Sequence, residues 1–166
     1  ERLLYVQRNT NRLLHLVNQL MDFRRAELGI FELRAVYSNA YKRILNCFMN
    51  YESLSKRKDI DYNFYTELQD KNVLFDENYL DLIANNLLSN AFKYTEVGES
   101  ITVKLYIEGD NLVLQVIDTG IGIPLEKQEK IFERFYQVEN GREGSGIGLI
   151  GSTSGGITSW ADYSTE

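Results

Sequence analysis

The most regular pattern of apolar and polar residues lies near the middle of the chain. From Leu112 to Ile117 (LVLQVI) successive residues fall on opposite faces, which is the period of a β-strand with one buried face. Ile101–Ile107 follows the same period, and the Glu108-Gly109-Asp110-Asn111 sequence between the two favours a tight turn. We therefore predict an antiparallel hairpin over these residues.

A second pattern, with helical spacing, marks the first part of the chain. Within Glu1–Glu27 apolar residues recur at alternating steps of three and four, which is the seam of a helix that packs against other helices. Gly29 is expected to end this helix. We place a domain boundary at Leu28–Gly29, so that 1–28 forms a bundle helix and 29–166 a second domain.

The remaining elements follow from shorter periodic runs that are bounded by capping residues. Strands are predicted over Ile30–Val36, Ile60–Leu68 and Asn72–Phe75, and helices over Asn39–Ser55 with Ser38 as N-cap, over Asn78–Thr95 with Asp76 as cap, and over Leu125–Phe135 after Pro124. This order predicts an α+β fold, a two-layer α/β sandwich with a mixed, mostly antiparallel sheet, preceded by the long helix. The basic run Lys56–Lys58 is expected to be a solvated helix end.

The composition excludes several classes of function. The 166 residues are 43% hydrophobic with one proline, which is typical of a folded domain and not of a disordered segment. The net charge of −6 offers no electrostatic footprint for nucleic acid or anionic lipid. No apolar run approaches the roughly 20 residues of a membrane helix, so we expect no membrane contact by this chain.

One cysteine and one histidine limit the chemistry further. Cys47 lies in the apolar run ILNCFM, where we expect a small buried hydrophobic residue and not a reactive thiol. A single cysteine excludes an internal disulfide and fits a reducing compartment. With His15 as the one histidine, a metal site of the His and Cys type has almost no ligands.

One predicted helix carries polar residues that suit a nucleotide. Asn86 and Asn90 are four residues apart and therefore share a face, and Lys93 and Tyr94 follow one turn later. An amide oxygen is a neutral ligand for Mg²⁺, which takes a few protein oxygens together with phosphate oxygens and water. A lysine is a point charge suited to phosphate, and a tyrosine offers a flat surface to a base.

Two glycine-rich stretches can bring backbone N–H groups close to a ligand. The strand that ends at Ile117 delivers Asp118, whose carboxylate can accept a hydrogen bond from an amino group. Gly120 and Gly122 follow, and glycine lets the backbone approach a ligand closely or take up positive φ. Further on, GREGSGIGL exposes backbone amides ahead of a predicted helix start, where phosphate can bind.

Four segments in this order resemble the boxes of histidine kinase ATP-binding domains. Asn85–Thr95 (NNLLSNAFKYT) is similar to the N box, Asp118–Gly122 (DTGIG) to the G1 box, Ile131–Val138 (IFERFYQV) to the F box and Gly141–Leu149 (GREGSGIGL) to the G2 box. The resemblance covers Glu1–Leu149 and implies a Bergerat-type ATP-binding fold with ATP and Mg²⁺ as cofactors.

The resemblance also implies a role for each matching residue. Asp118 would accept a hydrogen bond from the adenine 6-amino group, which guanine lacks, and Tyr94 would lie by the adenine. Asn90 would hold Mg²⁺, while Asn86 and Lys93 would meet the phosphates. The implied ATP-binding residues are Asn86, Asn90, Lys93, Tyr94, Asp118, Gly120, Gly122, Ile123, Phe135, Gly144, Gly146, Ile147, Gly148 and Leu149.

The first helix resembles the second helix of a histidine kinase dimerisation bundle. His15 is followed by LVNQL, with neither an acid nor a Thr-Pro beside it, so it does not match the family's phosphoacceptor histidine. We expect the acceptor upstream of Glu1, a homodimer through the bundle in the full-length protein and a membrane-anchored parent with this part in the cytoplasm. A response regulator receiver domain is the implied partner.

Asn86 separates two branches of this fold. In the related gyrase and Hsp90-type ATPases the matching position carries a glutamate that activates water, and an asparagine cannot act as a general base. We therefore expect phosphoryl transfer and not hydrolysis. Two alternatives stay open, a nucleotide-binding signalling module without kinase activity and an anti-sigma-type serine kinase on the same fold. The upstream residues would decide, because an H-box indicates a kinase.

The pattern weakens toward the C-terminus. Between Phe135 and Gly144 the sequence YQVENGRE is short for the lid that covers ATP in this family. After Leu149 the Ser-, Gly- and Thr-rich sequence has no helical stripe, where the family continues a helix.

Overall fold

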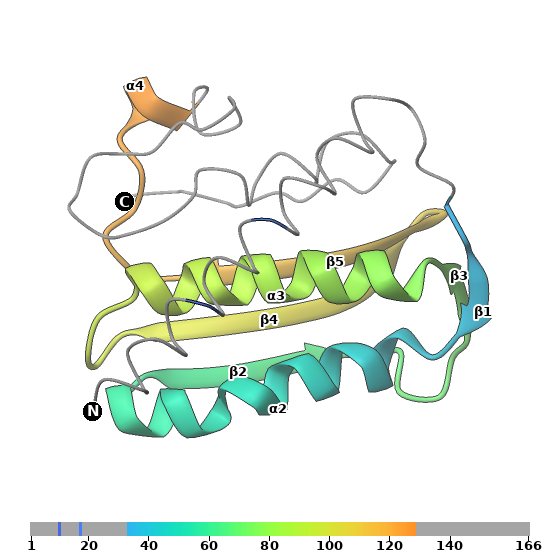
Figure 1. Ribbon diagram of the computed structural model, residues 1–166, viewed down its shortest axis with the longest axis horizontal. Coiled ribbons are helices and arrows are strands. Elements are labelled where there is room, and N and C mark those ends of the chain that lie inside the picture. The colour runs from blue at the N-terminus through green and yellow to red at the C-terminus, as the bar shows by residue number, and fades with distance from the viewer. Residues whose placement is uncertain (1–9, 11–16, 18–32, 129–166) are drawn as a thin grey trace.

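The computed structural model describes Thr10, Val17 and residues 33–128 (Figure 1). Thr10 and Val17 are helical, and the rest of the predicted helix over Glu1–Glu27 lies outside the described residues, as does the boundary predicted at Leu28–Gly29. In the described part no helix is long and apolar enough to cross a membrane.

The central sheet has three strands in the order β2-β4-β5. β4 (Ser100–Glu108) and β5 (Asn111–Asp118) form the predicted antiparallel hairpin, with Glu108 opposite Asn111 and a two-residue turn between them. Gly109 in this turn has φ +59°, a conformation that glycine adopts without strain. β2 (Asp61–Thr66) pairs with β4 in parallel, so the sheet is mixed.

Two helices cover one face of this sheet, as Figure 1 shows. They are α2 (Ala40–Lys58) and α3 (Glu77–Tyr94), and they pack on each other as well as on the strands. The largest fully buried apolar side chains come from both layers: Ile44, Leu88, Ile101, Val103 and Leu105. The predicted α+β sandwich is therefore confirmed, because helices and sheet bury their apolar faces against each other.

The segment before α2 differs from the prediction. The strand β1 is Val36–Ser38, so it begins where the predicted strand Ile30–Val36 was to end, and residues 33–35 have no regular structure. β1 pairs antiparallel with β3 (Val73–Phe75). The strand β3 itself was predicted, over Asn72–Phe75. Strand β1 depends on this partner, which lies far away in the sequence, and local periodicity could not place it.

The ends of α2 also differ from the prediction. Asn39, and not Ser38, is the N-cap: its side chain accepts a hydrogen bond from the Lys42 N–H at 2.9 Å. Both residue types are good caps, and here Ser38 ends β1 and donates to Glu77 Oε1 instead. The helix continues past Ser55 to Lys58, since basic residues in the last turn complement the helix dipole.

The N-terminus of α3 is fixed by the predicted cap, Asp76. Its Oδ1 accepts hydrogen bonds from the N–H groups of Asn78 (3.0 Å) and Tyr79 (3.1 Å), and its Oδ2 accepts one from the Arg34 N–H (2.8 Å). The carboxylate is buried, so it both caps the helix and ties it to the segment before β1.

Asp76→Ala is expected to lower the free energy of unfolding by about 1–2 kcal/mol, because two helix N–H groups and one loop N–H lose their acceptor. Urea unfolding measures this loss. The exposed Asp70, in the loop between β2 and β3, is the matched control, and Asp70→Ala should leave stability within about 0.5 kcal/mol of the wild type. Equal losses in the two variants would contradict the capping role.

Candidate nucleotide-binding site

The helix α3 presents the polar residues that the sequence singled out. Asn86 and Asn90 are one turn apart, and Lys93 and Tyr94 lie in the last turn. All four side chains are half-buried, so each lies at the surface without being fully solvated. Residues four apart on a helix lie on the same face, which places the two amides side by side.

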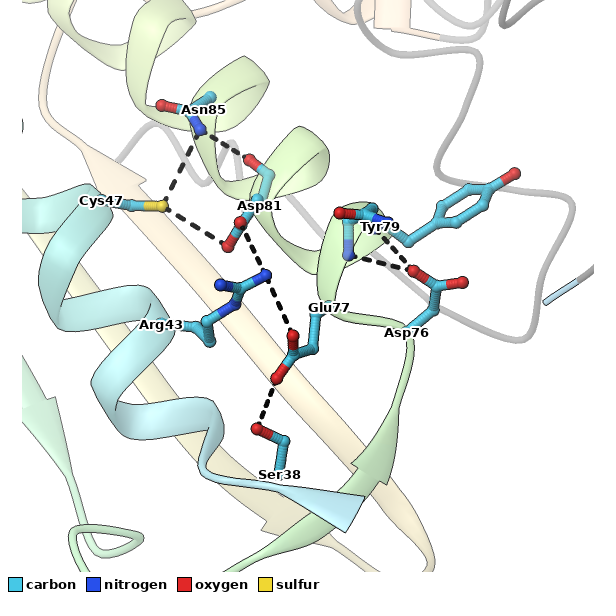
Figure 2. A network of polar contacts seen from close by, with 9 residues as sticks. Ser38, Arg43, Cys47, Asp76, Glu77, Tyr79, Asp81 and Asn85 are labelled. Atoms are coloured by element: carbon cyan, nitrogen blue, oxygen red, sulfur yellow. Dashed lines mark hydrogen bonds and ion pairs between the residues drawn. The ribbon is translucent and has the colours of Figure 1, made fainter. Parts of the chain in front are cut away.

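A different face of α3 is occupied by contacts to α2, which Figure 2 shows. Arg43 of α2 forms ion pairs with Glu77 (3.3 Å) and Asp81 (3.2 Å). Asn85 donates to the Asp81 carbonyl oxygen at 2.8 Å and lies 3.8 Å from Cys47 Sγ. These contacts hold α3 on α2, so this face of the helix is structural.

Two groups in this network have shifted pKa values. Burial, followed by the charge of Asp81, raises the pKa of the Cys47 thiol. Burial also raises the pKa of Asp81, although the Arg43 guanidinium opposes that shift. Cys47 is 5% exposed, and its thiol stays protonated at neutral pH because the thiolate is disfavoured. The prediction that Cys47 is buried is confirmed.

The side-chain amides of Asn86 and Asn90 differ from that of Asn85 in their hydrogen bonds. Among the described residues neither side chain has a hydrogen-bond partner, whereas the neighbouring Asn85 is bound to Asp81 and Cys47. A half-buried amide without a partner leaves its donors and acceptor available to a ligand. The two amides on this face therefore form the polar part of a candidate site.

Asp118, the last residue of β5, lies on the face of the sheet that the helices cover. It is opposite Ile101 in the register, and it continues the inward-facing row of Leu114 and Val116. This position explains why burial raises the pKa of Asp118, with a further rise from the charge of Glu99 and a partly opposing hydrogen bond from the Gly120 N–H at 3.1 Å. A carboxylate held in this way is a candidate functional group.

The turn after Asp118 is in direct contact with the end of α3. The Ile121 N–H donates to the Tyr94 carbonyl oxygen at 3.3 Å. A Cβ on Gly120 would lie 2.3 Å from that oxygen and 2.8 Å from the Tyr94 carbonyl carbon, closer than real Cβ atoms come. Only glycine permits this approach, so Gly120 joins the predicted N-box and G1-box segments.

Lys93 and Tyr94 interact with each other. Lys93 Nζ donates to Tyr94 Oη at 2.9 Å and lies 4.7 Å from the centre of the Tyr94 ring. The ammonium group is therefore held at the end of α3 near the aromatic ring, where both can meet a ligand.

Gly122 has φ +63°, which favours glycine and turns the chain away from β5.

Eight of the predicted ATP-binding residues lie in the described part, and they come from two segments that meet through Tyr94 and Gly120. They are Asn86, Asn90, Lys93, Tyr94, Asp118, Gly120, Gly122 and Ile123. The helix α4 (Leu125–Gln128) begins right after Pro124, as predicted, and the rest of that predicted helix lies outside the described residues. The other predicted residues also lie outside them: Phe135, Gly144, Gly146, Ile147, Gly148 and Leu149.

The sequence did not find one residue that supports this site. Lys58 was predicted to be solvated with Lys56 and Arg57, and this is wrong, because it is half-buried and bonds to the end of α3. Lys58 is a basic residue at the end of a helix, and such a residue ordinarily compensates the dipole of its own helix. Nothing local identifies the helix that Lys58 caps.

The described residues contain no group of three or more His, Cys, Asp or Glu side chains that could hold a metal ion. The donor set instead consists of neutral amides, which suit a Mg²⁺ ion that keeps phosphate oxygens and water as its other ligands. Asn90 fits such an ion as one of few protein ligands.

Comparison with known proteins agrees with this geometry. Residues 75–158, half of the chain, match the family described as histidine kinase-, DNA gyrase B-, and HSP90-like ATPase. Histidine kinase P4 of Formosa agariphila is 36% identical over 156 residues, which are 90% of this chain and 11% of that protein. The chain therefore spans a small part of this relative.

Solved structures share the fold. The catalytic domain of histidine kinase ThkA matches 73% of this chain and 77% of that chain, with 26% identity and a TM-score of 0.63. The structure of ThkA with response regulator protein TrrA matches 80% of this chain and 38% of that chain, and its 23% identity (TM-score 0.65) shows the fold alone. Full-length ShkA in complex with AMPPNP matches 84% of this chain and 29% of that chain, with 27% identity and a TM-score of 0.72.

Three findings agree. The family matches half of the chain, one relative is 36% identical to it, and the solved histidine kinase domain shares its fold. The chain belongs to the family of histidine kinase-, DNA gyrase B- and HSP90-like ATPases, and within it represents the ATP-binding catalytic domain of a sensor histidine kinase.

Proposed function

We propose that this domain holds Mg·ATP so that the γ-phosphoryl group can pass to a histidine on another segment of a longer kinase. The observation that carries this proposal is the contact between the turn after Asp118 and the end of α3, where Gly120 and Ile121 meet the Tyr94 carbonyl. A half-buried hydrogen-bond acceptor and two amides without a partner among the described residues then lie on adjoining elements. This arrangement suits a ligand with an amino-bearing base at one end and phosphates at the other.

Each residue has a role in this proposal. Asp118 accepts a hydrogen bond from the adenine amine, and Tyr94 lies by the base. Asn86 and Lys93 bind phosphate, and Asn90 gives its amide oxygen to the metal ion. Mg²⁺ bound with ATP would neutralise charge on the phosphates, and positioning and charge stabilisation account for most of the catalysis of phosphoryl transfer. The glycines at 144, 146 and 148, with Phe135, Ile147 and Leu149, complete the proposed site.

Transfer is favoured over hydrolysis because of the side chain at position 86. Asn86 cannot take a proton from water at neutral pH, so this helix face lacks a general base. The nucleophile is then a histidine outside this chain, which we propose lies on the first helix of a dimerisation bundle.

The proposal extends to the organisation of the whole protein. Residues 1–28 form the second helix of the bundle and dimerise in the full-length protein, while 29–166 form the catalytic domain on the cytoplasmic side of a membrane-anchored sensor. The phosphoryl group passes from histidine to an aspartate of a response regulator receiver domain. Support for this partner comes from the fold shared with ThkA, which has been solved with response regulator protein TrrA.

The test of the metal site compares two asparagines on one helix. Asn90→Ala is expected to weaken ATP binding about tenfold or more in the presence of Mg²⁺ and to leave binding without Mg²⁺ nearly unchanged, because a metal ligand is lost. Asn85→Ala removes the same side chain from the face that contacts α2, so affinity should not change. Calorimetric titration with ATP, with and without Mg²⁺, measures both.

Either of two results would contradict the proposal. If Asn90→Ala keeps the full dependence on Mg²⁺, the metal ligand lies elsewhere. If the wild-type chain binds no ATP in either condition, the proposed function is wrong.

A further inference from the structure

The C-terminal end of α3 is held by a charged side chain from the other helix. Lys58, in the last turn of α2, donates a short hydrogen bond to the Phe92 carbonyl oxygen and a second, at 3.5 Å, to that of Thr95. Carbonyl groups in the last turn of a helix have no partner within the helix, and they carry its partial negative charge. Lys58 therefore supplies both a donor and a compensating charge to a helix other than its own.

These two carbonyls lie on either side of Tyr94 in the sequence. Phe92 is 3% exposed and Thr95 is 1% exposed, so both ends of the segment that Lys58 holds are buried. The carbonyl of Tyr94, between them, is the group that receives the Ile121 N–H and touches Gly120. The segment from Phe92 to Thr95 therefore connects Lys58 to the turn that follows Asp118.

From these contacts we propose that Lys58 is a positioning residue for the nucleotide site. Its ammonium group fixes the last turn of α3, and through the Tyr94 carbonyl it sets where the Asp118–Ile121 turn lies. This inference rests on the proposed function, because it assumes that the site so arranged binds ATP. Lys58 need not touch the nucleotide.

The chain should fold without the ammonium group. The corner between α2 and β2 is joined to the loop after α3 by two backbone hydrogen bonds, from the Gly98 N–H to the Asp59 carbonyl (2.8 Å) and from the Asp61 N–H to the Glu99 carbonyl (2.9 Å). Neither bond involves a side chain, so both remain in a Lys58 variant. The effect of the variant is then local to the end of α3.

The test compares two lysines of the same helix end. Lys58→Met keeps the aliphatic stem and removes the charge, and it should weaken ATP binding roughly tenfold. Lys56→Met removes the same charge from a side chain that is 72% exposed and pairs with Glu52, so it should leave affinity within about twofold. Because both variants lose one positive charge, general attraction of the polyanionic ligand is matched. Lys58→Arg, which keeps a cation, should recover most of the affinity.

Amide hydrogen exchange without nucleotide gives a second readout. In Lys58→Met the Ile121 amide, which is bonded to the Tyr94 carbonyl, should exchange several-fold faster, while amides of β4 such as Val103 and Leu105 keep their protection. A role in general stability would instead speed exchange at all of these amides together. This readout does not depend on ATP.

The outcomes separate the two proposals. Failure of the wild type to bind ATP, with selective exchange at Ile121 in the variant, would overturn the proposed function and leave the structural role of Lys58 in place. Equal losses of affinity in Lys58→Met and Lys56→Met, or uniform loss of protection, would overturn the positioning role. If Lys58→Met does not fold, Lys58→Arg decides: affinity within about twofold of the wild type supports the cation as the active group, and a roughly tenfold loss overturns the positioning role.

Discussion

Asp118→Asn is expected to weaken ATP binding by about 10- to 150-fold, which corresponds to losing a hydrogen bond to a charged group, about 1.5–3 kcal/mol. Asparagine has nearly the same shape, but its amide is half donor and half acceptor, and it no longer offers a carboxylate to the adenine amine. Calorimetric titration of both proteins with ATP and with GTP measures the effect. The wild type should favour ATP, because guanine has an oxo group where adenine has the amine.

Glu99 provides the matched control for this variant. Its charge contributes to the raised pKa of Asp118, and Glu99 Oε2 accepts a hydrogen bond from the Glu96 N–H. Glu99→Gln removes one negative charge close to Asp118 without changing the acceptor itself. Its affinity for ATP should stay within about threefold of the wild type. Equal affinity of the wild type for ATP and GTP would show that Asp118 does not read the base.

The same substitution should not cost stability at neutral pH. Burial raises the pKa of Asp118 above its ordinary value of 3.8, so the folded state holds the proton more tightly than the unfolded state does. The stability that this group contributes is then present below the unfolded pKa and is lost as pH rises through the folded pKa. At neutral pH the charged side chain opposes folding. Asp118→Asn should therefore unfold at the same or higher urea concentration, with its advantage growing as pH rises above about 4.

Local signals were sufficient for most of the fold. The hairpin of β4 and β5 follows from two short runs of strand-forming residues and a two-residue turn, and the start of α3 follows from one capping residue, Asp76. Local signals failed where two neighbours were equally suitable, as at Ser38 and Asn39. They also failed for β1, because its pairing with β3 is set by contacts that lie far away in the sequence.

Part of the candidate site could also be predicted from the sequence, and part of it could not. The nucleotide ligand was predicted from the resemblance of four ordered segments to the histidine kinase boxes, and the side-chain chemistry of Asn86, Asn90 and Asp118 is compatible with it. Which asparagine is already committed could not be predicted: Asn85 and Asn86 are adjacent, and only the packing of α2 shows that Asn85 is bound. The role of Lys58 was hidden for the same reason, because the helix that it caps is not its own.

Gly120→Ala is expected to damage both the site and the fold. A Cβ at this position would lie 2.3 Å from the Tyr94 carbonyl oxygen, 2.8 Å from its carbonyl carbon and 3.0 Å from Asp118 Oδ1. The first two are backbone atoms that cannot rotate away, so the turn and the end of α3 must separate. Forcing atoms into a packed contact typically costs about 1–3 kcal/mol of stability. ATP binding should fall by roughly 10- to 100-fold, because Asp118 moves with the turn.

Gly109→Ala separates the effect on stability from the effect on ATP binding. Gly109, in the turn between β4 and β5, has φ +59°, and nothing lies within 4 Å of its added Cβ. An alanine there is strained by the backbone conformation alone, about 1–2 kcal/mol, so the two variants should lose similar amounts of stability. Urea unfolding measures this loss, and titration with ATP measures the site. Only Gly120→Ala should bind ATP more weakly, because only there does the methyl group separate the Asp118 turn from the helix that carries Asn86 and Asn90. If Gly120→Ala binds ATP as well as Gly109→Ala does, the contact with the Tyr94 carbonyl is not what holds the site together.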